Sequence, residues 1–360
     1  MKPKEFHIWD FPDNVYIDIN QSYKRKLYQK LEEQYKNMKS ISEALNYYPS
    51  SIREFFIKDK KKKFLPNNIL KTLIKLFPDM KDTLESNIKG YRGTNGYVIK
   101  NPKLPLIESP ELYNVVMHLL GDGSFEYYSN TCKELRQEFR KNLRVFGNFK
   151  TIERLLHTRV YIIKFPRIIS HILEHIFNID IVRPNRLPKI LFDAPLDCRI
   201  SAIRTIFDDE GSVSIRSKYK RYSLSITSSS ENFMNNIKSL LDSIQIISGK
   251  IIKYKSKRFS SYQMNVLSTS HKRFLNTIGF THPKKTKRFS FALKRKMRFR
   301  RLEEKICDVV SNNPITRYEL SKILNYDIDC LTYFIYKLRK QGRIKSSFNG
   351  RRKPYLWTMA

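Results

Sequence analysis

Two segments in the middle of the chain carry apolar residues at helical spacing, and both end in the same way. After Ser109 and Pro110, which suit the start of a helix, one face stays apolar as far as Leu120. A second apolar face runs from Leu196 to Phe207. The first segment closes with Asp122-Gly123-Ser124 and the second with Glu210-Gly211-Ser212. The chain therefore contains an internal repeat, and each predicted helix ends in an acid followed by glycine.

Alternation of apolar and polar residues follows the second predicted helix. Val213 and Ile215 alternate with serine and arginine, and residues 222–227 continue the pattern in a second strand. A helical segment at 231–244 separates this pair from two further strands near 252–255 and 262–266. The pattern is αββαββα, with one sheet face apolar and the other polar. The first copy is less regular, with a long basic helix at 131–146.

The two ends of the chain are predicted to form smaller helical modules. Residues 21–57 contain short helices joined by tight turns, with Ser40 and Glu43 spaced as a capping box, which favours a helix-turn-helix. At the C-terminus three helices, the second opened by a capping box of Thr316 and Glu319, precede two strands joined by a basic turn. This order predicts a winged helix that binds DNA. A small helical domain for protein contacts is the alternative.

Composition indicates a polyanion as partner. The 69 Lys and Arg residues exceed the 34 Asp and Glu, for a net charge of +35. Nucleic acid is the default partner for such a charge, and a membrane surface is the weaker alternative. The sequence lacks a membrane-length apolar run and a signal peptide, so we expect a cytoplasmic, nucleoid-associated protein. Its 4 cysteines are far apart, with no CxxC pair, which argues against zinc and disulfides and favours reduced core residues.

At the two helix ends the chain resembles the LAGLIDADG homing endonucleases, in the single-chain form with two motifs. Residues 203–211 occupy the nine positions of the family motif, and VVMHLLGDGS matches the other copy, although Leu120 stands where the family usually has its first aspartate. The segment IGFTHPKKTKRF is similar to the one that closes the second half in this family. The resemblance covers about half of the chain, and two motifs at domain spacing make it fairly specific.

The resemblance implies an α+β, pseudo-twofold saddle in which the two motif helices pack side by side. Eight strands would lie over the DNA major groove, and the two final acids would meet at the centre. We therefore expect a helix-turn-helix-like domain at 1–90, LAGLIDADG halves at 108–190 and 191–298, and a winged helix at 299–360. Gly121 and Ala202 are small enough for the two helices to approach closely.

Asp122 and Glu210 are the predicted catalytic and metal-binding acids. Two hard carboxylates can hold Mg²⁺, or Mn²⁺, which activates a water for phosphodiester hydrolysis. The resemblance adds the main-chain carbonyls of Gly121 and Asp209 as ligands, and a basic residue near each active centre, for which Lys285 is our candidate. Either motif alone would more often be a solvated helix end, whereas the two together favour a metal site.

Two neighbours of these acids receive a simpler interpretation. Asp208 is expected to be a solvated or locally paired carboxylate, and His118 a packing residue within the first helix. If the two halves form one centre, the carboxylates of Asp122 and Glu210 should lie within about 4 to 8 Å of each other.

Candidate DNA-binding residues have side chains that read base edges and phosphates and are predicted to lie opposite the core. On the strands they are Arg216, Lys218, Arg221, Lys253, Lys255, Gln263 and Asn265. In the predicted winged helix they are Lys337, Arg339, Arg351 and Arg352. The alternative is that these strand faces are merely solvated.

The leading hypothesis is a site-specific, divalent-metal-dependent DNA endonuclease. It would act as a monomer and cut both strands of a long asymmetric duplex site. A non-cleaving transcriptional regulator on the same fold is the first alternative. An intron RNA maturase is the second, since the charge suits RNA equally well. Because the chain starts with Met and lacks a His-Asn ending, we expect a free-standing protein rather than an intein.

Overall fold

The computed structural model describes residues 2–57, 64–216, 221–255, 260–326, 328–347 and 356–360. For residues 215, 216, 221, 294–301, 329 and 330 the backbone alone is described. The chain divides into two compact units, Met1–Lys287 and Arg288–Ala360. Helix α12 (Pro283–Asn312) begins in the first unit and ends in the second.

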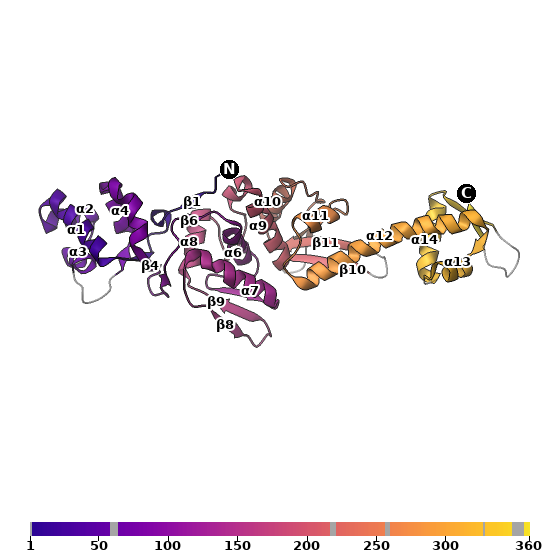
Figure 1. The fold of residues 1–360 in the computed structure, drawn as a ribbon, viewed down its shortest axis with the longest axis horizontal. Coiled ribbons are helices and arrows are strands. Elements are labelled where there is room, and N and C mark those ends of the chain that lie inside the picture. The colour runs from indigo at the N-terminus through magenta and orange to yellow at the C-terminus, as the bar shows by residue number, and fades with distance from the viewer. Residues whose placement is uncertain (1, 58–63, 217–220, 256–259, 327, 348–355) are drawn as a thin grey trace. The chain divides into compact units, whose positions relative to one another are not determined.

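The N-terminal part of the first unit combines helices with a small antiparallel sheet of order β3-β2-β4-β5 (Figure 1). Its helices are α1 (Gln21–Tyr35), α2 (Met38–Leu45), α3 (Pro49–Phe56), α4 (Asn67–Leu76) and α5 (Lys81–Leu84). Its strands are β2 (Tyr16–Ile19), β3 (Leu65–Pro66), β4 (Ile88–Arg92) and β5 (Ile99–Lys100). Strand β1 (Glu5–Phe6) pairs with β6 (Leu106–Ile107), so both ends of this part meet just before the repeat.

The expected capping box at Ser40 is wrong. Helix α2 begins at Met38 because Asn37 is its N-cap, and the Asn37 Oδ1 atom accepts a hydrogen bond from the Ser40 main-chain N–H at 2.9 Å. An asparagine side chain satisfies an otherwise unpaired helix N–H as well as serine does. The helix therefore starts about one turn earlier than the capping-box spacing indicates.

The first half of the repeat has the order αβαββα. Its elements are α6 (Pro110–Leu120), β7 (Tyr127–Asn130), α7 (Lys133–Asn142), β8 (Ile152–Leu155), β9 (Tyr161–Lys164) and α8 (Ile168–Phe177), and its sheet order is β7-β9-β8. The expected start of α6 is confirmed, since the Ser109 Oγ atom accepts from the Leu112 N–H at 3.2 Å.

This half does not contain the four strands that the eight-stranded saddle requires. Within residues 108–190, all of which are described, the segment after Gly123 makes a tight turn in which the Ser124 N–H donates to the Tyr127 carbonyl at 2.8 Å. Phe125 then packs its ring 5.2 Å from His171 of α8 instead of continuing a strand. The turn leaves β7 as the strand between α6 and α7.

The second half follows the expected αββαββα order. Its elements are α9 (Leu196–Asp209), β10 (Gly211–Arg216), β11 (Arg221–Ser228), α10 (Glu231–Asp242), β12 (Ile252–Lys255), β13 (Ser260–Val266) and α11 (His271–Thr277). The antiparallel sheet has the order β10-β11-β13-β12. Buried Leu224, Ile226 and Met264 form the side of the sheet that faces its helices.

In its described residues the second unit has three helical segments and a three-stranded sheet of order β14-β16-β15. After the last turns of α12 come β14 (Ile315–Thr316), α13 (Arg317–Leu324), α14 (Ile328–Lys340), β15 (Ile344–Ser347) and β16 (Leu356–Met359). The capping box of Thr316 and Glu319 is confirmed. Leu302, Leu331 and Trp357 lie in the core of this unit.

Two general expectations can be compared with the structure. Cys132, Cys198 and Cys307 are free and buried, which agrees with reduced core residues, whereas the side chain of Cys330 lies outside the described part. Over the described residues, the structure has no helix with both the length and the apolar character needed to cross a membrane.

Candidate functional site

The two motif helices end in matching turns that only glycine can make. A β-carbon at Gly123 would lie 2.3 Å from the Leu119 Cα atom, and one at Gly211 would lie 2.3 Å from the Phe207 carbonyl oxygen. Both contacts are far inside van der Waals distance and involve backbone atoms. The chain can therefore turn abruptly from helix to the next segment and present the acid of each turn, Asp122 or Glu210, at the helix end.

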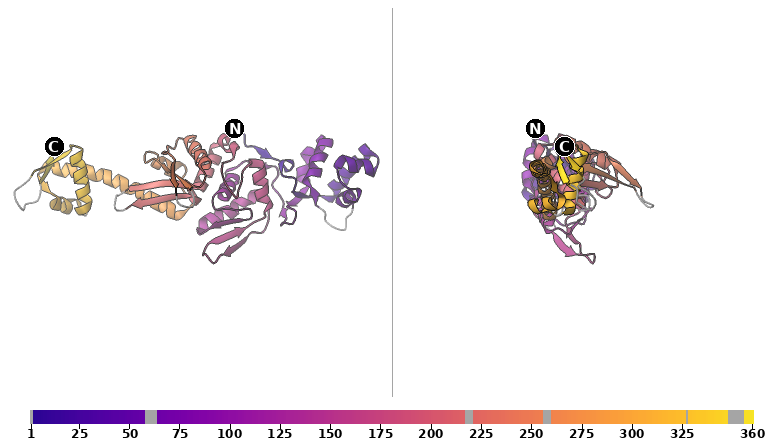
Figure 2. Two further views of the ribbon diagram at one scale, coloured as in Figure 1. Left: turned by 180° about the vertical axis from the view of Figure 1, so that it is seen from behind. Right: turned by 90° about the vertical axis from the view of Figure 1, so that its right-hand side faces the viewer.

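Helices α6 and α9 lie side by side (Figures 1 and 2), which confirms the expected packing of the two motifs. Polar groups connect them at regular intervals: the Asn114 amide donates to Thr205 Oγ1 at 2.8 Å, and Ser201 Oγ donates to the Pro110 carbonyl at 2.8 Å. Ala202 is fully buried between these contacts. Buried and partly buried hydrogen bonds of this kind fix the register of the two helices, because a slip would leave each group unpaired.

The strongest contact between the helices joins His118 and Asp209. The His118 Nδ1 atom lies 2.8 Å from Asp209 Oδ2, and neither side chain has any exposed surface. The Tyr128 hydroxyl donates to Asp209 Oδ1 at 2.9 Å. A β-carbon at Gly121 would come within 2.9 Å of Asp209 Oδ2, so the glycine makes room for this carboxylate.

His118 is a packing residue as expected, fully buried against the rings of Tyr128 and Phe139, and it also carries a charge that the sequence interpretation missed. Burial alone lowers the pKa of His118, but the charge of Asp209 and its hydrogen bond, with Glu138 as a further acid, raise that pKa to about 9. The imidazole is therefore protonated at neutral pH. Its Nε2 atom lies 3.9 Å from Glu138 Oε2, which is an ion pair too long to be a hydrogen bond.

Asn130 of β7 connects the buried pair to the first predicted catalytic acid. Its amide nitrogen donates to Asp122 Oδ2 at 2.8 Å and lies 3.4 Å from Asp209 Oδ1, while its oxygen accepts from the Cys132 N–H at 2.8 Å. Both amide groups are thus used, so the orientation of Asn130 is fixed. The sequence analysis missed Asn130 and Tyr128. Their alternate positions in the strand that follows the first motif place both side chains on one face, and this pattern could have identified them.

The two predicted acids are electrostatically strained. Burial, followed by the charge of Asp209, raises the pKa of Asp122 to about 6. Glu210 has an exposed side chain, yet protein displaces water around part of its carboxylate, and together with the charges of Asp122 and Asp209 this raises its pKa to about 7. Within the described residues no hydrogen bond reaches the Glu210 carboxylate. A cation placed at these acids would relieve their repulsion.

Asp208 is buried and paired through the backbone. Its two carboxylate oxygens accept from the N–H groups of Thr281 and His282 at 2.9 and 3.0 Å. The locally paired form of the earlier expectation is therefore correct, and the solvated form is not. This contact attaches the loop before α12 to the end of α9, and so positions Lys285 near that helix end.

Lys285 lies at the end of α9. Its Nζ atom donates to the main-chain carbonyls of Phe207 at 3.0 Å and Asp208 at 2.6 Å, and lies 3.4 Å from that of Asp209. A lysine in this position satisfies unpaired carbonyls and complements the negative end of the helix dipole. Burial lowers its pKa, and the four surrounding acids, Asp208 foremost, act in the opposite sense.

The donor set at the two helix ends fits a hard divalent cation. Asp122 and Glu210 supply carboxylate oxygens, and the predicted main-chain ligands, the carbonyls of Gly121 and Asp209, belong to the residues just before them. Among the described residues no cluster of three or more His, Cys, Asp and Glu side chains could hold a metal. Main-chain, water or phosphate oxygens would have to complete the coordination.

The strand candidates for DNA binding fall on two faces. Gln263 pairs with Thr227 and Ile252, and Asn265 pairs with Ser225, so these side chains share the polar face of the sheet. Lys253 instead pairs with Tyr262, and Lys255 with Ser260, which places both lysines on the face that carries buried Met264. The faces of β12 are thus the reverse of the prediction: Ile252 and Tyr254 of this edge strand are exposed on the polar face of the sheet.

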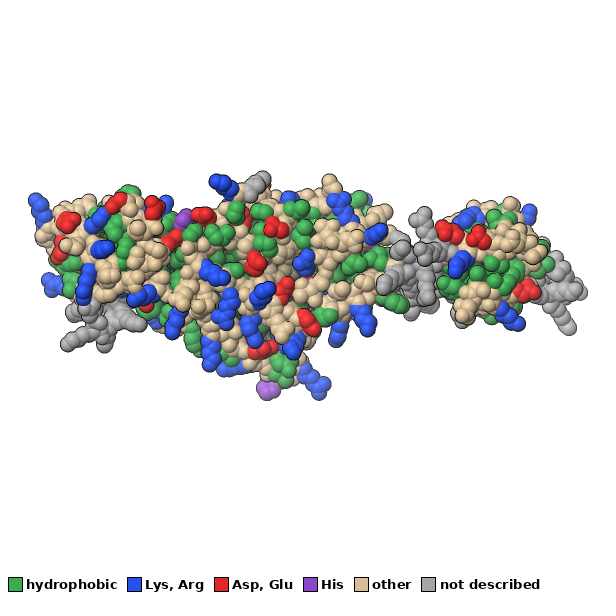
Figure 3. Space-filling view, in the orientation of Figure 1, with side chains coloured by type: hydrophobic (Ala, Val, Ile, Leu, Met, Phe, Trp, Pro, Cys, Tyr) green, Lys and Arg blue, Asp and Glu red, His purple; other side chains and the backbone are tan. Residues whose placement is uncertain are grey.

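The other candidates are distributed as follows. Lys337 forms an ion pair with Glu303, and Arg339 is exposed near the end of α14. Lys218, Arg351 and Arg352 lie outside the described residues, as do the side chains of Arg216 and Arg221. Figure 3 shows Lys and Arg side chains spread over the visible face instead of gathered into one patch.

Comparison with known proteins bears on the second half above all. Residues 197–279, which include α9 from its second residue onward and strands β10 to β13, match the family model described as LAGLIDADG-like domain. This match confirms the resemblance to the LAGLIDADG family. The matched segment contains nearly all of α9, which ends at Asp209 and is capped by Glu210.

A curated relative and several solved structures are also similar to the chain. Elongation factor 2 of Methanopyrus kandleri (strain AV19) is 27% identical over 175 residues, a match that spans 47% of this chain but only 13% of that protein. The crystal structure of I-DmoI in complex with DNA and Mn has 12% identity and a TM-score of 0.33 and covers 47% of this chain and 96% of that one. The structure of the homing endonuclease I-WcaI bound to its DNA recognition sequence has 12% identity and a TM-score of 0.35, and the match covers 50% of this chain and 86% of that one. These structural similarities are too low to carry an argument about activity.

Proposed function

We propose that this protein is a site-specific DNA endonuclease that requires a divalent metal and cuts both strands of a long asymmetric site as a monomer. The observation that supports it best is the pairing of two electrostatically strained acids, Asp122 and Glu210, at adjoining helix ends. Their pKa values, raised to about 6 and about 7, indicate a place prepared for a cation. A protein that only binds DNA gains nothing from such repulsion.

Asp122 and Glu210 would hold Mg²⁺ or Mn²⁺, and the bound metal would supply an activated water and stabilise charge on the phosphate oxygens. The chain's own residues orient this centre. Asn130 holds the Asp122 carboxylate at 2.8 Å, and Lys285 fixes the end of α9, from which Glu210 projects. Solvent reaches the exposed Glu210 side chain, which leaves an approach for a phosphate.

The flanking parts would extend the DNA contact. The order of helices and strands in the second unit supports a winged helix, with α14 as the helix for the major groove. In this proposal Arg339 is a phosphate contact, while Lys337 is engaged by Glu303. The short helices α1, α2 and α3 would form a second helix-turn-helix module. Tethered modules raise affinity through effective concentration.

The test begins with selection of bound duplexes from a randomised DNA library by the full chain in Ca²⁺. The selected duplex is then incubated with Mg²⁺ or Mn²⁺, and nicked and linear products are separated on a gel. We expect Glu210→Gln and Asp122→Asn to bind this duplex as tightly as wild type within a few-fold and to cut it at least about 100-fold more slowly, given the several kcal/mol that a metal contributes.

Asp193→Asn is the matched control, because it neutralises an exposed acid near the start of α9 without touching the site. It should cut at the wild-type rate. Selective binding without cleavage by the wild type in either metal would instead support a regulator. Preference for structured RNA over the selected duplex would support a maturase.

A further inference from the structure

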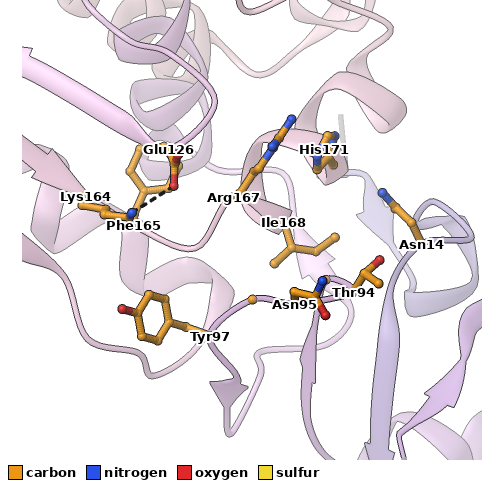
Figure 4. A pocket seen from close by; sticks show the side chains of 12 residues that line it. Asn14, Thr94, Asn95, Tyr97, Glu126, Lys164, Phe165, Arg167, Ile168 and His171 are labelled. Carbon is orange, nitrogen blue, oxygen red and sulfur yellow. Dashed lines mark ion pairs between the residues drawn. The ribbon is translucent and has the colours of Figure 1, made fainter.

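A pocket of about 410 Å³ lies in the first unit, away from the paired helix ends. One wall is the loop Gly93–Tyr97, which joins β4 to β5 in the N-terminal part. The opposite wall is the segment from Lys164 to His171, where β9 ends and α8 begins. Figure 4 shows Thr94, Asn95 and Tyr97 on one side, and Lys164, Arg167 and His171 on the other.

The wall next to α8 is cationic, and its free charge is on Arg167. The guanidinium group lies 5.1 Å from the centre of the Phe125 ring, which orients it without neutralising it. Among the described residues no carboxylate lies within 4.0 Å of it. Lys164 Nζ, by contrast, pairs at 3.3 Å with Oε2 of Glu126, which also lines the pocket, so these two charges offset each other and that of Arg167 remains. The pocket therefore favours an anion, and Arg167 is the group that would bind it.

The loop wall adds neutral hydrogen-bonding groups. Thr94 and Asn95 are exposed, and Tyr97 has 56% of its surface exposed. Within the described residues their side chains make no hydrogen bonds. One arginine together with several unused neutral donors suits a phosphodiester, whose charge is single and whose sugar and ester oxygens accept hydrogen bonds.

The position of the pocket indicates where that phosphodiester comes from. Glu126 directly precedes β7, and Lys164 is the last residue of β9, where it pairs with Tyr127. The pocket thus adjoins the end of the first sheet, whose strands the resemblance to the LAGLIDADG family places over the DNA. We propose that it binds a backbone phosphate of the DNA beside the first half, so that the Gly93–Tyr97 loop and Arg167 lengthen the recognised site. This proposal rests on the proposed function.

The test measures binding of the selected duplex in Ca²⁺ as a function of salt, for the full chain and for Arg167→Ala. Loss of one phosphate contact should reduce the log–log salt slope by about 0.9 and weaken binding several-fold at 0.15 M salt. In an ethylation-interference assay, ethylation of one flanking phosphate should interfere with binding by the wild type but no longer with binding by Arg167→Ala. Arg167→Lys should restore most of the salt slope. Asn95→Ala should weaken binding and leave the salt slope unchanged.

Arg183→Ala is the control, because Arg183 is exposed after α8 and does not line the pocket, yet its replacement removes the same charge. The proposal is overturned if Arg167→Ala and Arg183→Ala behave alike, or if the wild type does not bind duplex DNA. A free phosphate compound is distinguished by titration with inorganic phosphate and dAMP. Saturable binding that Arg167→Ala abolishes, with an unchanged DNA slope, would reassign the pocket. Absence of cleavage with the expected slope change would contradict the nuclease alone.

Discussion

The buried pair of His118 and Asp209 allows a quantitative prediction for His118→Leu. The substitution leaves the Asp209 carboxylate inside the protein without its cation, although Tyr128 and Asn130 still approach its Oδ1 atom. Removing one partner of a buried ion pair typically costs about 3–5 kcal/mol. Because one or two hydrogen bonds remain, we expect the lower end, about 3 kcal/mol. At roughly 2–4 °C per kcal/mol this lowers Tm by about 6–12 °C.

Urea and thermal unfolding of the metal-free full chain, followed by circular dichroism, provide the measurement. Two transitions are expected if the units unfold separately, and only that of the first unit should move. His175→Leu changes an exposed histidine on α8 and should stay within about 0.5 kcal/mol of wild type. The double variant His118→Leu/Asp209→Asn, which no longer buries a lone charge, should be more stable than the sum of the single changes predicts by at least about 1.5 kcal/mol.

The same pair gives a dependence on pH. The pKa of His118 is about 9 in the folded state against its ordinary value of 6.5, so its contribution is complete below pH 6.5 and disappears as pH rises through 9. The stability difference between wild type and His118→Leu should shrink over that window. A difference equal to that of His175→Leu at pH 6, or one that grows toward pH 10, would refute the assignment of a protonated His118 bound to Asp209.

Three further perturbations address other parts of the chain. The pKa of Glu210 is raised from 4.5 to about 7, so its ionisation destabilises the metal-free fold as pH rises through that range. In the same unfolding assay, Glu210→Gln should therefore be more stable than wild type at pH 8 and equally stable at pH 4. Gly123→Ala should destabilise the first unit by more than about 2 kcal/mol, since its β-carbon meets the Leu119 backbone at 2.3 Å, whereas Gly96→Ala, with no atom closer than 3.7 Å, should have little effect on thermal unfolding. Arg339→Ala should reduce the salt slope of DNA binding by about 0.9 and Lys337→Ala by less, because Glu303 already neutralises Lys337; equal effects would contradict the assignment of α14.

The sequence predicts the motif helices and their ends because periodicity, an N-cap and a glycine are local signals. Helix α6 starts at Pro110 as expected, and α14 stops before Gly342, whose φ is +71°. The polar connections between α6 and α9 are not local. Residue order does not show that Asn114 contacts Thr205. For the same reason it does not show that His118 and Tyr128 contact Asp209.

The prediction of which side chains lie on each face of a strand was wrong in β12 for a related reason. An edge strand such as β12 is exposed on both sides, so apolar Ile252 and Tyr254 do not have to face the core, and alternation alone assigned them to the wrong side. In the first half, the turn after Gly123 replaces a strand because Phe125 finds a partner in His171. Both outcomes depend on contacts between segments far apart in the chain.

The asymmetry of the buried pair has an evolutionary consequence. A repeat of this kind suggests descent from a duplicated single half that once paired with its own copy. The residue that corresponds to Asp209 in the first half is Gly121, and the space that this glycine leaves is what admits the carboxylate. Two copies of the second half would bring two aspartates into one buried position, without room or a counter-charge. The two halves are therefore no longer interchangeable, because only the first provides the space that the Asp209 carboxylate needs.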